Sequence, residues 1–271
     1  SVFGIGNGKQ SYDNIGSNSG SIVIIDKEAT INGNVYGGGN YGYVGIQNQA
    51  TTEIKINGGT IKGSVYGGGN NNGAGSNYID ATINIEMTAG TVQGSIYGGS
   101  RAKGTIYGSS TVNILGGAIS TDIYGGGEGG YTNSNSPGTF VRDNISVNIG
   151  TSDAGPTITG SVYGGSAYGS VNGTSNNGSA NNKSTNVTVN QGVIKKSVFG
   201  GGKGNDQYTP KVYGNITVTI NNGSIGNVFG GNDAAGSPSN NDVVYLSGGI
   251  IENAYGGGNE TGQTITNIYL Q

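Results

Sequence analysis

Apolar and polar residues alternate along short stretches of the chain. In "EIKI", residues 53–56, Ile54 and Ile56 alternate with a glutamate and a lysine. A period of two residues is typical of a β-strand that buries one face. A glycine pair at 58–59 marks a turn, and a second alternating stretch follows over 60–68. This segment therefore predicts two consecutive strands.

The same pattern returns along the whole chain. Inward pairs of the first predicted strand are Ile54/Ile56, Ile85/Met87, Val112/Ile114, Val147/Ile149, Val187/Val189, Val218/Ile220 and Val244/Leu246. Inward residues of the second strand are Ile31, Ile61, Val92, Ile119, Ile158, Ile194, Ile225 and Ile250. The last strand contributes Val35, Val65, Ile96, Ile123, Val162, Val198, Val228 and Ala254. Each unit offers only four or five inward aliphatic residues, so we expect units to bury them by stacking on one another.

A second feature recurs with the aliphatic pattern. An aromatic residue follows each last-strand aliphatic residue and precedes a run of glycines, as in "SVYGGGN" at 64–70. These aromatic residues are Phe3, Tyr36, Tyr66, Tyr97, Tyr124, Tyr163, Phe199, Phe229 and Tyr255. They are 26 to 39 residues apart, which indicates stacked repeats with insertions of variable length.

These patterns predict an all-β fold, a parallel β-solenoid of about 8–9 coils with roughly 30 residues each. Successive coils are expected about 4.8 Å apart, and right-handed because most parallel crossovers turn that way. We expect residues 1–271 to form one repeat domain that belongs to a longer protein. A β-propeller and a polyglycine sandwich fit less well, since the units have too few strands and too short glycine runs.

Differences in length fall mainly between the glycine run and the next first strand. The longest inserts span 128–144 and 166–186, and a further insert lies at 151–156. The variable segments are therefore expected to gather on one edge of the stack, where repeat proteins often bind ligands. The stretch 172–182 has no apolar residue to anchor it, so the stack is expected to fold without it.

Composition narrows the chemistry. The chain has 58 glycines in 271 residues, no cysteine and no histidine, which excludes disulfides, thiolate metal sites and imidazole catalysis. The net charge is -3 and no basic cluster occurs, which argues against a nucleic-acid partner. No apolar run approaches the length of a membrane span.

The repeated units, "hxGGxIxGxVYGGG" with h apolar, resemble the glycine-rich β-strand repeats of large secreted bacterial surface proteins, which are adhesin-like β-solenoids. Autotransporter passengers and tail-spike shafts share that architecture. The resemblance covers essentially the whole chain and implies an extracellular location with an attachment or spacer role. It supplies no functional residues. The acidic "GGxGxDx" nonapeptide of calcium-binding β-rolls is absent.

The recurring aromatic residues are the main candidate site. If the preceding aliphatic residue points inward, the ring points outward and stacks on its neighbours, contributing about 0.2–1 kcal/mol per pair. Exposed rings beside serine and glycine would also form a platform for sugar rings. The candidate ligand platform consists of Tyr36, Tyr66, Tyr97, Tyr124, Tyr163, Phe199, Phe229 and Tyr255.

Charged residues occur four positions after several of these rings. Arg101 and Glu128 follow consecutive rings, as do Lys203 and Asp233. Stacking in register would place each opposite-charge pair on adjacent coils, where an exposed pair contributes little stability. We expect these residues to form charge-compensated contacts.

Two further sets of residues are candidates for a site. Asp122, Glu128, Asp143 and Asp153, with Arg142 beside them, come nearest to the carboxylate cluster that a polysaccharide-cleaving enzyme needs. A second set, Asp206, Asp233 and Asp242, is a weak candidate for Ca²⁺; otherwise no cofactor is expected. Thr217 and Thr219 make a paired threonine row in one unit only, which does not fit an ice-binding face.

The sequence thus favours a non-enzymatic, extracellular adhesin-like or structural repeat module at a bacterial cell surface. The expected partner is a glycan or another ligand on a host or cell surface, and a carbohydrate would bind at the loop-rich edge or the outward aromatic face. The alternative is a polysaccharide-degrading enzyme or phage tail-spike with its acidic site at 122–153. The terminal stretches "SVFG" and "TITNIYLQ" are expected to be part-coils with open strand edges, which favours end-to-end self-association.

Overall fold

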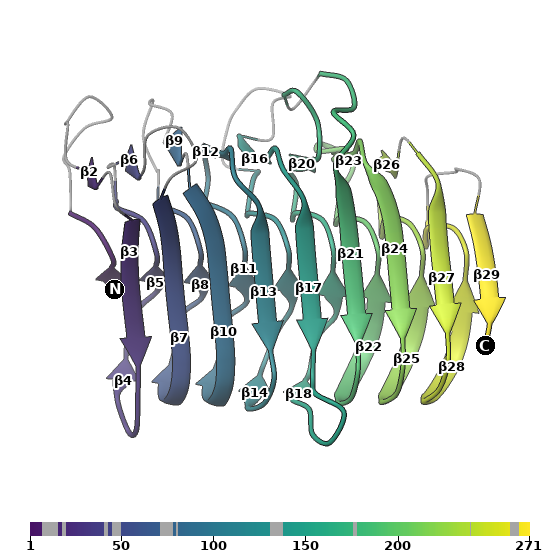
Figure 1. Cartoon of the computed structure of the whole chain (residues 1–271), viewed down its shortest axis with the longest axis horizontal. Coiled ribbons are helices and arrows are strands. Elements are labelled where there is room, and N and C mark those ends of the chain that lie inside the picture. The colour runs from purple at the N-terminus through teal and green to yellow at the C-terminus, as the bar shows by residue number, and fades with distance from the viewer. Residues whose placement is uncertain are drawn as a thin grey trace.

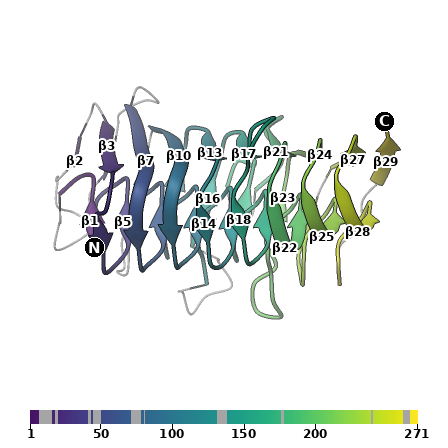
Figure 2. The same ribbon diagram turned by 90° about the horizontal axis from the view of Figure 1, so that it is seen from below.

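The computed structural model contains strands and no helix among the residues it describes, which are 1–6, 16–17, 20–40, 43–44, 50–70, 78–79, 81–130, 138–175, 178–238, 240–260 and 266–271. Twenty-one strands form one parallel sheet and eight form a second. The strands of successive repeats lie side by side along one long axis (Figures 1 and 2). The predicted all-β class and parallel pairing are confirmed.

The first strand of each repeat carries the clearest alternation. These strands are β3 (Gly20–Ile25), β7 (Ala50–Ile61), β10 (Ala81–Val92), β13 (Ser110–Ile114), β17 (Ile145–Ile149), β21 (Ser184–Val189), β24 (Asn215–Ile220), β27 (Asp242–Leu246) and β29 (Thr266–Leu270). Each pairs in register with the equivalent strand of the next repeat, as Val112 does with Ile85 and Val147. The predicted inward residues from Ile54 to Val244 are buried, and Leu246 is partly buried against the same core.

A second strand follows the turn. It forms the later part of β7 and β10, and otherwise β4 (Thr30–Ile31), β14 (Ala118–Ile119), β18 (Thr157–Ile158) and the first part of β22 (Val193–Phe199), β25 (Ser224–Phe229) and β28 (Ile250–Tyr255). One inward assignment is wrong here: Ile250 is 75% exposed, because it pairs with Ser224, while Ile251 pairs with the buried Ile225. Because residues 250 and 251 are both isoleucine, the sequence could not show which of them points inward.

The third strand carries the aromatic residue. It is β1 (Val2–Phe3), β5 (Val35–Tyr36), β8 (Val65–Tyr66), β11 (Ile96–Tyr97), β15 (Ile123–Tyr124), β19 (Val162–Tyr163) and the last part of β22, β25 and β28. The aliphatic residues of these strands belong to the main core, and the rings belong to a second cluster. We call these two clusters the aliphatic column and the aromatic column.

The sequence did not predict a fourth strand within the variable segments. This second sheet consists of β2 (Gly16–Ser17), β6 (Tyr43–Val44), β9 (Tyr78–Ile79), β12 (Gly104–Ile106), β16 (Thr139–Val141), β20 (Ser170–Val171), β23 (Lys211–Val212) and β26 (Ser237–Pro238). Ile106, Val141 and Val171 of these strands are fully buried. Each variable segment therefore contributes one short strand to the second sheet, and part of that sheet belongs to the core. The segments differ in the length of the chain before and after that strand.

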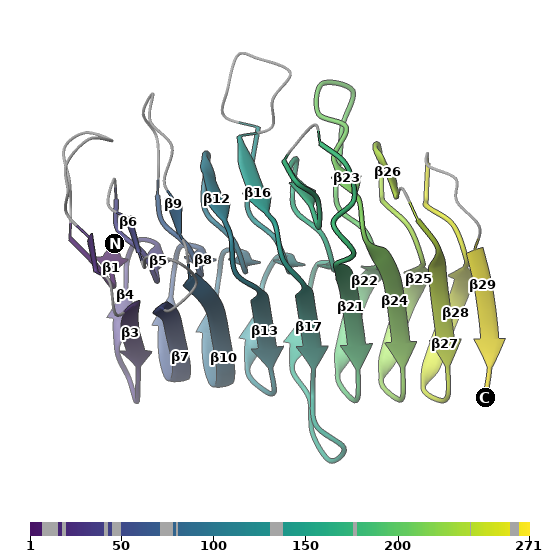
Figure 3. The same ribbon diagram turned by 45° about the horizontal axis from the view of Figure 1, so that its top comes forward.

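The prediction that the variable segments gather on one edge is confirmed for the residues that the structure describes. In Figure 1 the short strands of the second sheet, from β2 to β26, lie along the same edge of the stack, and Figure 3 shows β12, β16 and β23 rising from it. The insert at 151–156, between β17 and β18, leaves from the opposite edge (Figure 1). The stretch at the C-terminal end, β29, pairs in register with β27, as expected of the first strand of a further repeat.

Candidate functional site

The aromatic column runs the length of the stack. Consecutive rings from Phe3 to Tyr255 have centroids 4.6 to 5.0 Å apart and planes within 3 to 11° of parallel. This spacing is the distance between neighbouring parallel strands, so strand pairing in register sets the ring stacking. The predicted aromatic ladder is confirmed.

Each glycine run is required by space. A Cβ on the first glycine of the run, such as Gly37, Gly98 or Gly164, would overlap the carbonyl oxygen of the equivalent glycine in the next repeat. A backbone atom cannot rotate away as a side chain can. The close approach of successive repeats after each ring therefore excludes every side chain from this position.

The third position of the run is different, because it admits a small polar residue. Ser100, Ser166 and Asn232 stand there in three repeats, and each is fully buried. The side-chain oxygen of each accepts a hydrogen bond from the amide of the third glycine in the preceding repeat, at 3.3 Å, 3.1 Å and 2.9 Å respectively. These residues satisfy backbone donors that lie away from water.

The next residue covers the aromatic column. Asn70, Arg101, Glu128, Ala167 and Lys203 form a parallel row of bridges from one repeat to the next. Ala167 is buried against the rings. The side chains of this row therefore cover one edge of the aromatic column. The sequence had indicated only pairs of opposite charge at these positions.

Glu128 of this row, and Asp233 at the same position of a later repeat, each accept a hydrogen bond from a tyrosine hydroxyl two repeats away. The Tyr66 hydroxyl donates to Glu128 Oε2 at 2.6 Å, and the Tyr163 hydroxyl donates to Asp233 Oδ2 at 2.8 Å. In both cases one further ring lies between the ring that donates and the ring that the acid follows. The hydroxyl of Tyr124 instead donates at 3.1 Å to Oδ2 of Asp122, the residue just before its own strand.

Burial keeps these phenols protonated. It is the main cause that raises the pKa of Tyr66, Tyr124 and Tyr163 well above that of a free tyrosine, and the negative charges of Glu128, Asp122 and Asp233 raise the pKa further. Burial also raises the pKa of Tyr36, whose hydroxyl accepts a hydrogen bond from Asn34. A neutral phenol that donates to a carboxylate is the stable arrangement in such a site.

The expectation that the ring faces are open to solvent is wrong. The seven residues from Tyr36 to Phe229 are only 2 to 7% exposed, and Tyr255 in the last ring position is 46% exposed. The faces are covered by the neighbouring rings and one edge by the row that begins at Asn70. A sugar ring therefore has no face to lie on along the predicted platform of Tyr36, Tyr66, Tyr97, Tyr124, Tyr163, Phe199 and Phe229.

The predicted charge pairs are confirmed in part. Arg101 Nε lies 3.5 Å from Glu128 Oε2, as expected for adjacent repeats. Lys203, however, lies 3.8 Å from Asp122 Oδ2, and Asp233 receives hydrogen bonds from Tyr163 and Asn259. The pairing differs because Asp233 turns towards a buried hydroxyl that needs an acceptor.

The acids of the predicted catalytic cluster do not converge. Asp143 precedes β17 and pairs with Lys183 at 2.9 Å, whereas Asp153 follows β17, across a strand that spans about 17 Å. Asp122 and Glu128 lie beside the aromatic column. Arg142 lies over the ring of Tyr107 at 5.7 Å. The loops at 122–153 thus distribute these residues over separate places.

The candidate calcium residues also lie apart. Asp206 is exposed in a loop, Asp233 lies beside the aromatic column and Asp242 is buried at the start of β27. Within the part of the chain that the structure describes, no group of three or more acidic residues could hold a metal ion.

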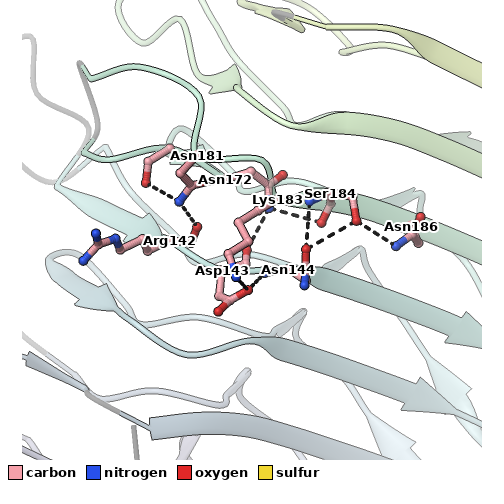
Figure 4. Close-up of polar contacts among 9 residues, drawn as sticks. Arg142, Asp143, Asn144, Asn172, Asn181, Lys183, Ser184 and Asn186 are labelled. Atoms are coloured by element: carbon pink, nitrogen blue, oxygen red, sulfur yellow. Dashed lines mark hydrogen bonds and ion pairs between the residues drawn. The ribbon is translucent and has the colours of Figure 1, made fainter. Parts of the chain in front are cut away.

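The stretch 172–182 is tied into the stack more firmly than its sequence suggests. Asn172 is fully buried, and its amide donates to the carbonyl oxygens of Asp143 at 2.7 Å and Ser184 at 3.2 Å. The Asn181 amide donates to the carbonyl oxygen of Arg142 at 2.8 Å (Figure 4). Polar contacts here replace the missing apolar anchor, so its deletion would remove buried hydrogen bonds.

One pocket beside the aromatic column was not predicted. It has a volume of about 250 Å³ and is lined by Asp122, Ser161, Tyr163, Lys196, Ser197, Phe199, Lys203, Asp233 and Asn259. In a chain with only 10% charged residues, two lysines and two aspartates meet here. The sequence carried a signal for it, since the rings at 199 and 229 are phenylalanines, whose missing hydroxyls leave space beside Tyr163.

Comparison with family models, curated proteins and solved structures found no match to this chain. In the described residues no helix has the length and apolar character needed to cross a membrane.

Proposed function

We propose that the chain is a non-enzymatic, extracellular, adhesin-like or structural repeat module, built as a right-handed β-solenoid at a bacterial cell surface. The observation that carries this proposal is the parallel register of both columns, which is kept on either side of the local register shifts near Ala89 and between Ile194 and Ser197. Rings stack from Phe3 to Tyr255, and first strands pair from β3 to β29. Such a stack is a stiff spacer, because bending it would separate paired strands and stacked rings together.

The loop-rich edge supports an attachment role. The stack keeps its register while the segments around β16 and β20 vary in length, so binding groups could change there without disturbing the spacer. These segments are rich in asparagine, serine and threonine. Amide and hydroxyl groups both donate and accept hydrogen bonds, which suits the hydroxyl groups of a glycan.

An array of immobilised glycans tests the proposal. The purified chain is applied to the array, and in parallel it is incubated with the same polysaccharides while newly formed reducing ends are measured. We expect retention on a subset of glycans with no new reducing ends. Formation of reducing ends would overturn the non-enzymatic assignment, and absence of retention on every glycan would overturn the carbohydrate partner.

A further inference from the structure

The pocket beside Phe199 has the composition of a binding site. It lies where the aromatic column changes from tyrosine to phenylalanine, beside Tyr163 and Phe199. Asp233 reaches past both phenylalanines to accept the Tyr163 hydroxyl. The hydroxyl groups that fill this place in the tyrosine part of the column are absent here, and the pocket takes their volume.

Two acceptors in the pocket are held in fixed positions. Asp233 receives the Tyr163 hydroxyl on Oδ2 and the Asn259 amide, at 3.0 Å, on Oδ1. Asp122 receives the backbone amide of Ser161 at 2.8 Å on Oδ1. Each carboxylate oxygen can accept more than one hydrogen bond, so both acids remain able to bind a hydroxyl group.

Donors are also available. Lys196 is exposed and its ammonium group makes no ion pair with any residue that the structure describes. The Ser197 hydroxyl likewise has no hydrogen-bond partner among those residues. The Lys203 contact with Asp122, at 3.8 Å, is too long for a good hydrogen bond, which leaves Lys203 able to donate to a ligand.

The charge balance indicates the class of ligand. Two lysines and two aspartates give the pocket no net formal charge, so it does not favour an anion or a cation. Donors and acceptors lie side by side instead, which matches groups that do both, such as neighbouring hydroxyls. The volume of about 250 Å³ is below the usual range of about 300–1,000 Å³ for larger ligands, so one small unit would fill it.

From this geometry we propose that the Phe199 pocket binds one unit of a neutral saccharide, with its hydroxyls bridging Asp233 and Lys196. The inference rests on the carbohydrate partner of the proposed function and assigns that partner to one place. The pocket opens along the side of the aromatic column, so neighbouring sugars of a chain would extend along the stack and leave the ring faces untouched.

The test uses affinity electrophoresis of the whole chain in gels that contain a neutral polysaccharide (glucan, mannan or galactan) or an acidic one (hyaluronate or heparin). Lys196→Met removes one donor, and Ser197→Leu fills the pocket. Lys195→Met is the matched control, because Lys195 is the exposed neighbour that does not line the pocket. Melting curves of all variants establish that they are folded.

We expect retention by at least one neutral polysaccharide that persists in about 0.5 M NaCl, where the Debye length falls to about 4 Å. Lys196→Met and Ser197→Leu should each weaken retention about tenfold, as the loss of a charged hydrogen bond or of space would, and Lys195→Met should leave it unchanged. Equal retention of all variants would overturn the pocket and leave the proposed function standing. Retention only by acidic polysaccharides, lost in salt, would overturn the neutral class. No retention at all would overturn the pocket and the carbohydrate partner together.

Discussion

The two columns leave the same short strands in opposite directions and are buried by different means. In the aliphatic column, residues from three strands of each repeat converge, as Ile54, Ile61 and Val65 do. In the aromatic column each ring is in single file, between two other rings and under the row of residues that follows the glycines. Stacking in register can therefore bury side chains in two ways: residues from several strands pack together, or equivalent residues of successive repeats pack on one another. In the aromatic column, the tyrosine hydroxyls also need polar partners.

This comparison predicts a larger penalty for breaking the aliphatic column. Ile61→Asp would bury a carboxylate between the Ile31 and Val92 positions of adjacent repeats, with no partner for its charge. We expect a loss of more than about 4 kcal/mol, or failure to fold. The neighbouring Lys62 is exposed, so Lys62→Asp is the control and should change stability by less than about 0.5 kcal/mol. Urea unfolding measures both, and equal effects would show that the two faces of this strand are misassigned.

The aromatic column should lose less from a single deletion. Tyr97 is buried between Tyr66 and Tyr124, with ring centroids 4.9 Å away on both sides. Tyr97→Ala should cost about 3–5 kcal/mol, the usual range for emptying a large aromatic site. Tyr97→Phe keeps both stacked contacts and should cost less than about 1.5 kcal/mol. If the two variants unfold at the same urea concentration, ring stacking is not what stabilises this column.

A smaller effect is expected where the glycine run closes over the column. A Cβ on Gly99 would lie 2.6 Å from the Gly127 nitrogen, whereas one on Gly257, at the same place in the last motif, meets nothing within 4 Å. Gly99→Ala should therefore destabilise by about 1–3 kcal/mol through overpacking, and Gly257→Ala should be close to neutral. Thermal melts of the pair separate crowding from the general effect of replacing glycine, and matching shifts would contradict the crowding argument.

The smallest predicted effect is a fall in the free energy of unfolding in alkaline solution, which the aromatic column causes and the aliphatic column does not. The raised pKa of Tyr66 means that the unfolded chain loses this proton near pH 10 while the folded chain retains it. Its contribution is therefore complete below pH 10 and declines as the pH rises above that value. Between pH 8 and 11, Tyr66→Phe should lose about 1.4 kcal/mol less stability than the unaltered chain. Urea unfolding at both pH values measures this, with Phe199→Leu, which titrates nothing, as control. Identical pH dependence in all three proteins would contradict burial of the phenol.

Alternation was enough to predict the aliphatic column, because a period of two residues leaves only one face for Ile54, Ile56 and their equivalents. The error at Ile250 arose where both candidate positions held isoleucine, so that hydrophobicity could not set the register. The strand around Val141 escaped prediction because a single buried aliphatic residue in a variable segment has no period.

The candidate site was harder to predict for a different reason. The recurrence of Tyr66 and its equivalents predicted ring stacking, but exposure depends on what covers the rings. Besides the neighbouring rings, part of the cover comes from Glu128 and Asp233, which lie 62 and 70 residues from the tyrosines that they contact. Such distances cannot be inferred from local pattern, and the pocket at Phe199 depends on the same long-range contacts.

The two acid–tyrosine bonds have a consequence for how the stack loses its structure. In a simple array each unit is coupled only to its immediate neighbours, so melting can begin at an end and advance one unit at a time. The hydrogen bonds that Tyr66 donates to Glu128 and that Tyr163 donates to Asp233 each skip a unit, which adds a coupling between second neighbours. When one unit at the end of such a block opens, its contacts with both the next unit and the one after it are weakened. A boundary between ordered and melted chain therefore has a higher free energy inside either three-unit block than outside it. Each block of three units is therefore expected to unfold cooperatively, as one unit.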